Sequence, residues 1–116
     1  MTAKNELKEG VIQELQRYIS EKIDSRGFND EPLHERLLLL MEEVGELAKA
    51  CRKLNGMNID VNRSADYDIG EEITDVLNML FAVGIVLNID IEKEFLKKES
   101  IVDKRFYERS KTNKDA

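Results

Sequence analysis

Two short acidic clusters interrupt the most apolar segments of this 116-residue chain. The first is Glu42-Glu43-Val44-Gly45-Glu46, and the second is Glu72-Ile73-Thr74-Asp75. At about 100° per residue, Glu43 and Glu46 share a helix face with apolar residues, and so do Glu72 and Asp75. Carboxylates that face a core and repel one another are costly unless a cation or basic side chains compensate them. The pattern therefore favours a site for a hard divalent cation, which prefers oxygen ligands.

The alternative for such acids is an ordinary solvated helix face, because most glutamates are exposed. Two features favour the metal site over this alternative. The acids lie on the apolar side of each segment rather than opposite it. The second cluster also repeats the i, i+3 spacing of the first, which places two carboxylates on one face.

Composition restricts the class of protein. A length of 116 residues supports one domain, expected to span 1–116 with a core at about 5–109. The net charge of −6, from 24 acidic and 18 basic residues, argues against a nucleic-acid binder. The single cysteine, Cys51, permits no internal disulfide, and we expect it in the core or at its boundary. With no signal-peptide pattern, and with an apolar run too short to span a bilayer, we expect a cytoplasmic chain without membrane contact.

Helical spacing of apolar residues and the lack of a hairpin signal predict an all-α fold. We expect helices over residues 5–25, about 32–54, about 69–87 and about 91–109. Between the second and third helices we expect a loop at 55–68, and from Ser110 a frayed polar tail. Helix ends are indicated by Gly27, Pro32, Asp68 and Asp90.

The third predicted helix is apolar on all sides from Val76 to Leu87, with Asn78 and Gly84 as the exceptions. Such a helix must be covered all round, which three other helices of a small chain cannot easily do. We therefore expect a homo-oligomer with an interface along this helix. Asn78 either donates a hydrogen bond to phosphate or base, or satisfies a polar gap at that interface.

The order of these motifs resembles the MazG-like, all-α nucleoside triphosphate pyrophosphohydrolases. The resemblance spans roughly residues 24–106 and is carried by RGFNDE, EEVGELAKA, and GEEITDVL followed by an apolar run ending in LNIDIEKEF. It implies a bundle of four to five helices, completed by a partner subunit in a dimer or tetramer. It also implies cleavage of an NTP or dNTP, modified nucleotides included, to the monophosphate and pyrophosphate.

The resemblance further implies which residues form the site. Those matching the metal ligands of the family, for Mg²⁺ or its substitute Mn²⁺, are Glu43, Glu46, Glu72 and Asp75, with Glu42 as a further acid nearby. Family members carry basic residues near the chain end that meet the phosphates, and their counterparts here are Lys98, Lys104 and Arg105. Asp103 stands where the family pattern has asparagine. A carboxylate not fully used as a ligand, Glu42 or Glu46, would take a proton from the attacking water.

Three other classes fit parts of the pattern. A di-iron carboxylate bundle uses inward glutamates but adds Glu-x-x-His, and the only histidine, His34, lies outside both acidic motifs. A phosphoribosyl-ATP pyrophosphohydrolase resembles the same superfamily, although the long loop at 55–68 fits it less well. A non-catalytic helical oligomer would keep the acids for structure or regulation.

Overall fold

The structure, a computed structural model, describes the backbone of residues 6–54 and 68–115 and the side chains of 6–54 and 68–105. It contains four helices: α1 (Val11–Ser25), α2 (Leu33–Leu54), α3 (Ile69–Val86) and α4 (Ile91–Asp115). These described ranges hold no strand, which confirms the all-α prediction. Apart from Asp68, the loop predicted at 55–68 lies outside them.

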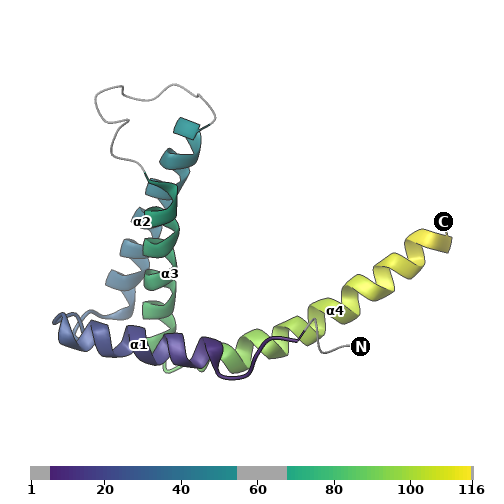
Figure 1. Ribbon diagram of the computed structural model, residues 1–116, viewed down its shortest axis with the longest axis horizontal. Coiled ribbons are helices and arrows are strands. Elements are labelled where there is room, and N and C mark those ends of the chain that lie inside the picture. Colours follow the sequence, from purple (N-terminus) through teal and green to yellow (C-terminus); the bar gives the residue numbers. More distant parts are fainter. Residues whose placement is uncertain (1–5, 55–67, 116) are drawn as a thin grey trace.

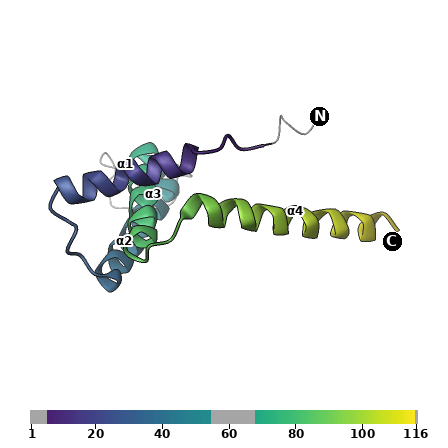
Figure 2. The same cartoon turned by 90° about the horizontal axis from the view of Figure 1, so that it is seen from below.

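The helices form a hairpin, a crossing helix and an extended arm. α2 and α3 pair as an antiparallel hairpin, and α1 lies across one end of it (Figure 1). α4 starts at that same end, contacts α1, and extends away from the hairpin (Figure 2). The radius of gyration is 18.6 Å, compared with about 13 Å for a compact domain of this length. A single chain is therefore far more open than a closed four-helix bundle.

A carboxylate from α4 fixes the start of α1. The backbone N–H groups of Gly10, Ile12 and Gln13 donate to the Glu92 carboxylate at 3.0, 3.0 and 3.1 Å. Glu92 is only 7% exposed, and its charge sits where the α1 dipole favours an anion. Gly10 has φ +90°, which breaks the helix before this point. The predicted start at residue 5 is therefore wrong, because α1 begins at Val11.

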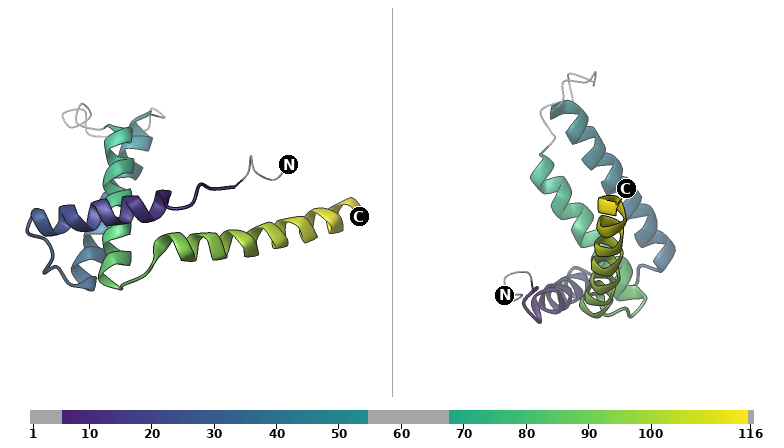
Figure 3. Two further views of the ribbon diagram at one scale, coloured as in Figure 1. Left: turned by 60° about the horizontal axis from the view of Figure 1, so that its bottom comes forward. Right: turned by 90° about the vertical axis from the view of Figure 1, so that its right-hand side faces the viewer.

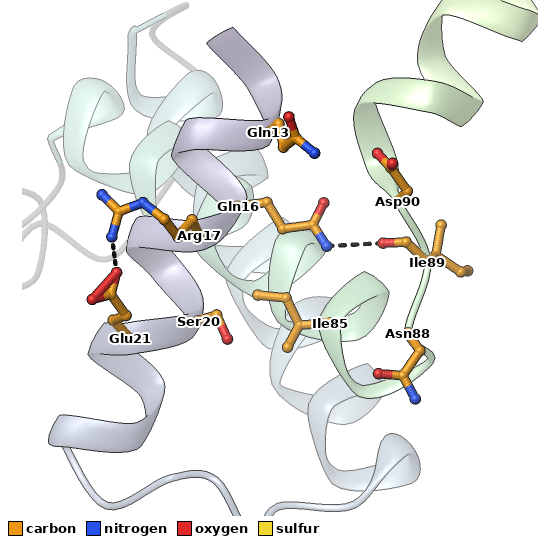
Figure 4. A pocket seen from close by; sticks show the side chains of 9 residues that line it. All are labelled: Gln13, Gln16, Arg17, Ser20, Glu21, Ile85, Asn88, Ile89 and Asp90. Carbon is orange, nitrogen blue, oxygen red and sulfur yellow. Dashed lines mark hydrogen bonds and ion pairs between the residues drawn. The ribbon is translucent and has the colours of Figure 1, made fainter. Parts of the chain in front are cut away.

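Gln16 joins α1 to the turn between α3 and α4 (Figure 4). Its amide nitrogen donates to the carbonyl oxygen of Ile89 at 2.8 Å, and its amide oxygen accepts the N–H of Ile91 at 3.1 Å. In the turn itself, Asn88 has φ +55°, and the N–H of Ile89 donates to the carbonyl of Gly84. A Cβ on Gly84 would lie 2.8 Å from Ile91 Cδ1. The close contact at Gly84 therefore fixes the position of Ile91, the first residue of α4, against α3.

Arg36 on α2 is a buried cation, with an exposed fraction of 2%. Its Nη1 donates to the carbonyl of Ala82 at 2.8 Å, and its Nε donates to the carbonyl of Glu31 at 2.9 Å. Ala82 lies in the last part of α3, where the negative end of the helix dipole favours a positive charge. Arg36 therefore ties α2 and the segment before it to α3.

Most predicted helix ends are confirmed. Gly27 follows α1 with φ +80°. The carboxylates of Asp68 and Asp90 accept the N–H groups of Glu71 and Lys93, both at 3.1 Å. Besides the start of α1, the end of α4 differs from the prediction, because this helix continues to Asp115 rather than ending near 109 with a frayed tail from Ser110. No glycine or proline occurs between residues 91 and 115 to stop it.

Surface positions also test two expectations about single residues. His34 is exposed, as predicted. Cys51 is exposed too, whereas we expected it in the core or at its boundary. Its neighbour Ala50 takes the buried position instead, with an exposed fraction of 2%.

The described part of the chain buries few apolar side chains fully and leaves wide apolar stripes open. On α2, Leu38 and Met41 are 66% and 64% exposed, and at about 100° per residue they lie opposite Glu43. On α3, Ile73 and Leu80 are 53% and 52% exposed. Both helices of the hairpin therefore carry apolar surface that one chain does not cover.

Within the described residues, no single helix is long and apolar enough to cross a membrane. α3 and the first part of α4 (Ile91–Arg105) satisfy the length and composition criteria only as a pair, and they meet at a bend of 103°.

Candidate metal centre

Three carboxylates from two helices converge on the hairpin. Glu43 comes from α2, while Glu72 and Asp75 come from α3, one turn apart. One ligand oxygen from each of the three lies within 4.8 Å of the others. Glu43 and Glu72 are half-buried, and Asp75 is exposed. The antiparallel pairing of α2 with α3 thus brings together acids that are far apart in the sequence.

The protein compensates these charges poorly. Burial, followed by repulsion from Asp75, raises the pKa of both Glu43 and Glu72. Glu72 Oε2 is buried and has no hydrogen-bond partner among the described residues. In the same part of the chain, no basic side chain forms an ion pair with any of the three. An all-oxygen donor set with excess negative charge fits a hard cation such as Mg²⁺.

The other two predicted acids lie near this group but outside it. Glu46 is half-buried, and its carboxylate lies 3.7 Å from the Lys49 ammonium. Its charge still raises the pKa of Glu43 and of Glu72. Glu42 is exposed, and its charge contributes to the raised pKa of Glu43. The structure therefore brings together three of the four predicted ligands and places Glu46 and Glu42 beside them.

A hollow of about 190 Å³ opens next to the acids. The hairpin contributes Glu43, Asp75 and Asn78 to its wall, and α1 contributes Lys22, with Arg26 just after the helix. The Asn78 amide nitrogen donates to the carbonyl of Thr74 at 3.1 Å, so this side chain is held along its own helix. Acidic, basic and amide groups therefore meet in one small space.

Sequence reasoning missed the contribution of α1 to this hollow. Lys22 and Arg26 are spaced one turn apart at the end of α1, and Arg26 is the first residue of the RGFNDE motif, which also contains Phe28 of the wall. This spacing predicts that the two cations lie on the same side of the helix. It does not predict that they lie near the acids, because that depends on α1 crossing the hairpin.

The predicted phosphate contacts on α4 lie elsewhere. Lys98, Lys104 and Arg105 are all exposed. None of them lines the hollow beside the acids, because α4 extends away from the hairpin (Figure 3). Within one chain, the structure therefore does not bring these cations to the carboxylates.

Larger hollows occur elsewhere, with different chemistry. One of about 490 Å³ lies between α1 and the α3–α4 turn, with Gln13, Gln16 and Arg17 in its wall (Figure 4). Another, of about 890 Å³, lies beside Leu7 and Phe95. Among the described residues, the single group of carboxylates close enough to hold a metal is Glu43, Glu72 and Asp75. The smaller hollow is therefore the one with a candidate centre.

No protein-family model matches the chain, and no curated protein is significantly similar to it. The arrangement of the acids and the hollow is therefore the observation that bears on function.

Proposed function

We propose that this chain is a Mg²⁺-dependent nucleoside triphosphate pyrophosphohydrolase of the MazG-like type. The observation that carries the proposal is the convergence of Glu43, Glu72 and Asp75 beside a hollow that also contains basic and amide groups. The sequence motifs that resemble this family contain these same acids. The proposed reaction converts an NTP or dNTP to the monophosphate and pyrophosphate.

The proposed roles of the acids follow from their positions. Glu43, Glu72 and Asp75 hold the metal, and Glu46 becomes a fourth ligand if it leaves Lys49, which lies 3.7 Å away. When bound, Mg²⁺ supplies positive charge to phosphate oxygens and acidifies a water molecule. Glu42, exposed and outside the group of three, accepts the proton of the attacking water. Asn78 donates to a phosphate or to the base.

The proposed enzyme works as a homo-oligomer, a dimer or tetramer. Ligand pockets usually enclose about 300–1,000 Å³, whereas the hollow beside the acids measures about 190 Å³. A second copy that packs on the hairpin covers the open stripes at Leu38, Met41, Ile73 and Leu80. Because Leu38 and Met41 lie opposite Glu43, the extended α4 of that copy then supplies the missing walls of the hollow. An extended α4 also allows Lys98, Lys104 and Arg105 to reach the site of another subunit.

A labelled-water experiment tests the reaction. The purified chain is incubated with Mg²⁺ and a panel of standard and modified nucleoside triphosphates in ¹⁸O water. Attack at the α-phosphorus places the label in the monophosphate and leaves pyrophosphate unlabelled. No G-x-x-x-x-G-K-[ST] loop is present to cradle β- and γ-phosphates, so attack at the γ-phosphorus is not expected.

Each other outcome selects an alternative class. Label in orthophosphate would indicate a phosphatase-like reaction. Turnover of phosphoribosyl-ATP alone would favour the phosphoribosyl-ATP pyrophosphohydrolase. No metal-dependent turnover across the panel, in a chain that still binds Mn²⁺, would favour a non-catalytic oligomer.

A further inference from the structure

The end of α1 brings two cations to the wall of the acidic hollow. Lys22 and Arg26, one turn apart, line the same space as Glu43 and Asp75. Neither cation lies within 4.0 Å of a carboxylate among the described residues. Arg17, on the same helix, differs from them because it pairs with both Glu14 and Glu21. The charges of Lys22 and Arg26 are therefore available to a ligand.

The backbone holds this end of α1 in place. The N–H of Gly27 donates to the carbonyl of Asp24 at 3.1 Å, and the N–H of Phe28 donates to that of Ile23 at 2.9 Å. Arg26 is the C-cap residue of this turn. The Lys22 ammonium lies 5.5 Å from the centroid of the Tyr18 ring. That cation–π contact is weak at an exposed site, so a phosphate can displace it.

The charge of the site calls for cations besides a metal. Three carboxylates carry more negative charge than a divalent ion carries positive charge. The metal centre as a whole would therefore not attract the remaining phosphate oxygens of a triphosphate. Pyrophosphate gains negative charge as it leaves, and fixed cations near it stabilise the transition state. Charge-assisted hydrogen bonds from lysine and arginine are the strong contacts for such oxygens.

We propose that Lys22 and Arg26 bind the β- and γ-phosphates, which depart as pyrophosphate. This assignment rests on the pyrophosphohydrolase function proposed above and gives that function a phosphate subsite within the same chain as the metal ligands. The three carboxylates, which would hold the metal, then lie on the α-phosphate side of the substrate. α1 becomes a wall of the site and not only a support for the hairpin.

Binding of inorganic tripolyphosphate tests this subsite without any nucleobase. Its affinity for the full chain is measured by calorimetry with Mg²⁺ present, for wild type, Lys22→Gln and Arg26→Gln. We expect each variant to bind about tenfold more weakly, because each loses one charge-assisted contact. Lys22→Arg should keep most of the affinity. Mn²⁺ affinity without phosphate should be unchanged or tighter, since a positive charge near the acids is removed.

A matched control separates the subsite from general charge effects. Arg17→Gln removes a charge from the same helix outside the hollow, and it should bind tripolyphosphate within about twofold of wild type. Equal losses in Arg17→Gln, or wild-type affinity in both Lys22→Gln and Arg26→Gln, would overturn the subsite. If those two variants also release pyrophosphate at the normal rate, the subsite alone is wrong. If the wild type binds no tripolyphosphate and cleaves no nucleotide, the subsite and the proposed function fall together.

Discussion

The Glu92 carboxylate accepts the backbone N–H of Gly10 at 3.0 Å, so the first turn of α4 caps the helix that starts at the other end of the chain. The same carboxylate serves Ile12 and Gln13. α1 in turn carries Lys22 to the hollow beside the acids. The buried Glu92 side chain therefore connects the first turn of α4 to α1, the helix that forms one wall of the candidate site.

Replacing Glu92 by alanine should destabilise the protein substantially. Three N–H groups lose their acceptor, and the α1 dipole loses its anion, so we expect a loss of about 2–3 kcal/mol. Urea unfolding followed by circular dichroism measures this difference. Glu94→Ala is the matched control, because Glu94 lies in the same turn but is exposed, and it should cost less than about 1 kcal/mol. Equal losses in the two variants would show that the cap contributes little.

The helices themselves could be predicted because their determinants are local. Apolar spacing located all four, and Asp68 and Asp90 cap the helices that they were expected to cap. The end of α4 was predicted poorly, since a polar composition after Ser110 indicates exposure but not the end of a helix. The start of α1 depends on Glu92, and a cap supplied from so far away leaves no local pattern.

The buried polar contacts could not be predicted from the sequence. Arg36 lies within a leucine-rich stretch and would ordinarily be assigned to the surface. It is buried because carbonyls from α3 and from the segment before α2 happen to surround it. The role of Gln16 likewise depends on the turn that α4 makes at Ile89.

The acidic part of the site was predicted better than its basic part. Glu43, Glu72 and Asp75 could be grouped because their helices had to pair through the faces that carry them. The cations cannot be grouped in the same way, because their distance from the acids depends on where α1 and α4 lie. Lys22 and Arg26 reach the hollow, whereas Lys98, Lys104 and Arg105 do not within one chain.

Changing Glu72 to glutamine should remove most metal binding and activity while preserving the helices. Glu72 lies in the group of three and carries the unpartnered buried oxygen. We expect Mn²⁺ affinity to fall by more than the roughly 10–100-fold typical of changes outside the ligand set. Calorimetry with Mn²⁺ and a pyrophosphate-release assay measure the two losses. Glu71→Gln, at the exposed neighbouring position, should keep both properties, and full activity in Glu72→Gln would exclude a ligand role.

Stability without metal should depend on pH in a defined direction. The pKa values of Glu43 and Glu72 are raised above their ordinary value of 4.5, mainly by burial. A raised pKa means that the folded state binds the proton more tightly than the unfolded state does. The stability from these two groups is therefore present below about pH 4.5 and lost as pH rises through the raised values.

Mg²⁺ should reverse that loss near neutral pH. Thermal melts from pH 4 to 8, with and without Mg²⁺, should show a stabilising shift that grows with pH, since protons compete with the metal for the same carboxylates. In Glu72→Gln, both the pH-dependent loss and the Mg²⁺ shift should shrink. A Mg²⁺ shift that is the same at pH 4 and pH 8 would contradict a carboxylate site.

A charge placed on the open apolar stripe of α2 should dissociate the protein without unfolding it. Leu38 is 66% exposed in one chain, so Leu38→Glu should cost a lone chain only about 0.5 kcal/mol or less. If a second copy covers this stripe, the same charge becomes buried without a partner and costs several kcal/mol. Sedimentation velocity at micromolar concentration distinguishes the two situations, with a dimer or larger species expected for the wild type.

The comparison with Phe81→Glu makes this assembly test specific. Phe81 is buried within the chain itself, with an exposed fraction of 6%, so a charge there should unfold the chain at any concentration. Leu38→Glu should instead keep its helical circular dichroism and sediment as a monomer. Its nucleotide turnover should fall even though all three metal ligands are intact, because the walls supplied by a second copy are gone. A wild type that sediments as a monomer and retains full activity would show that the hollow works without a partner.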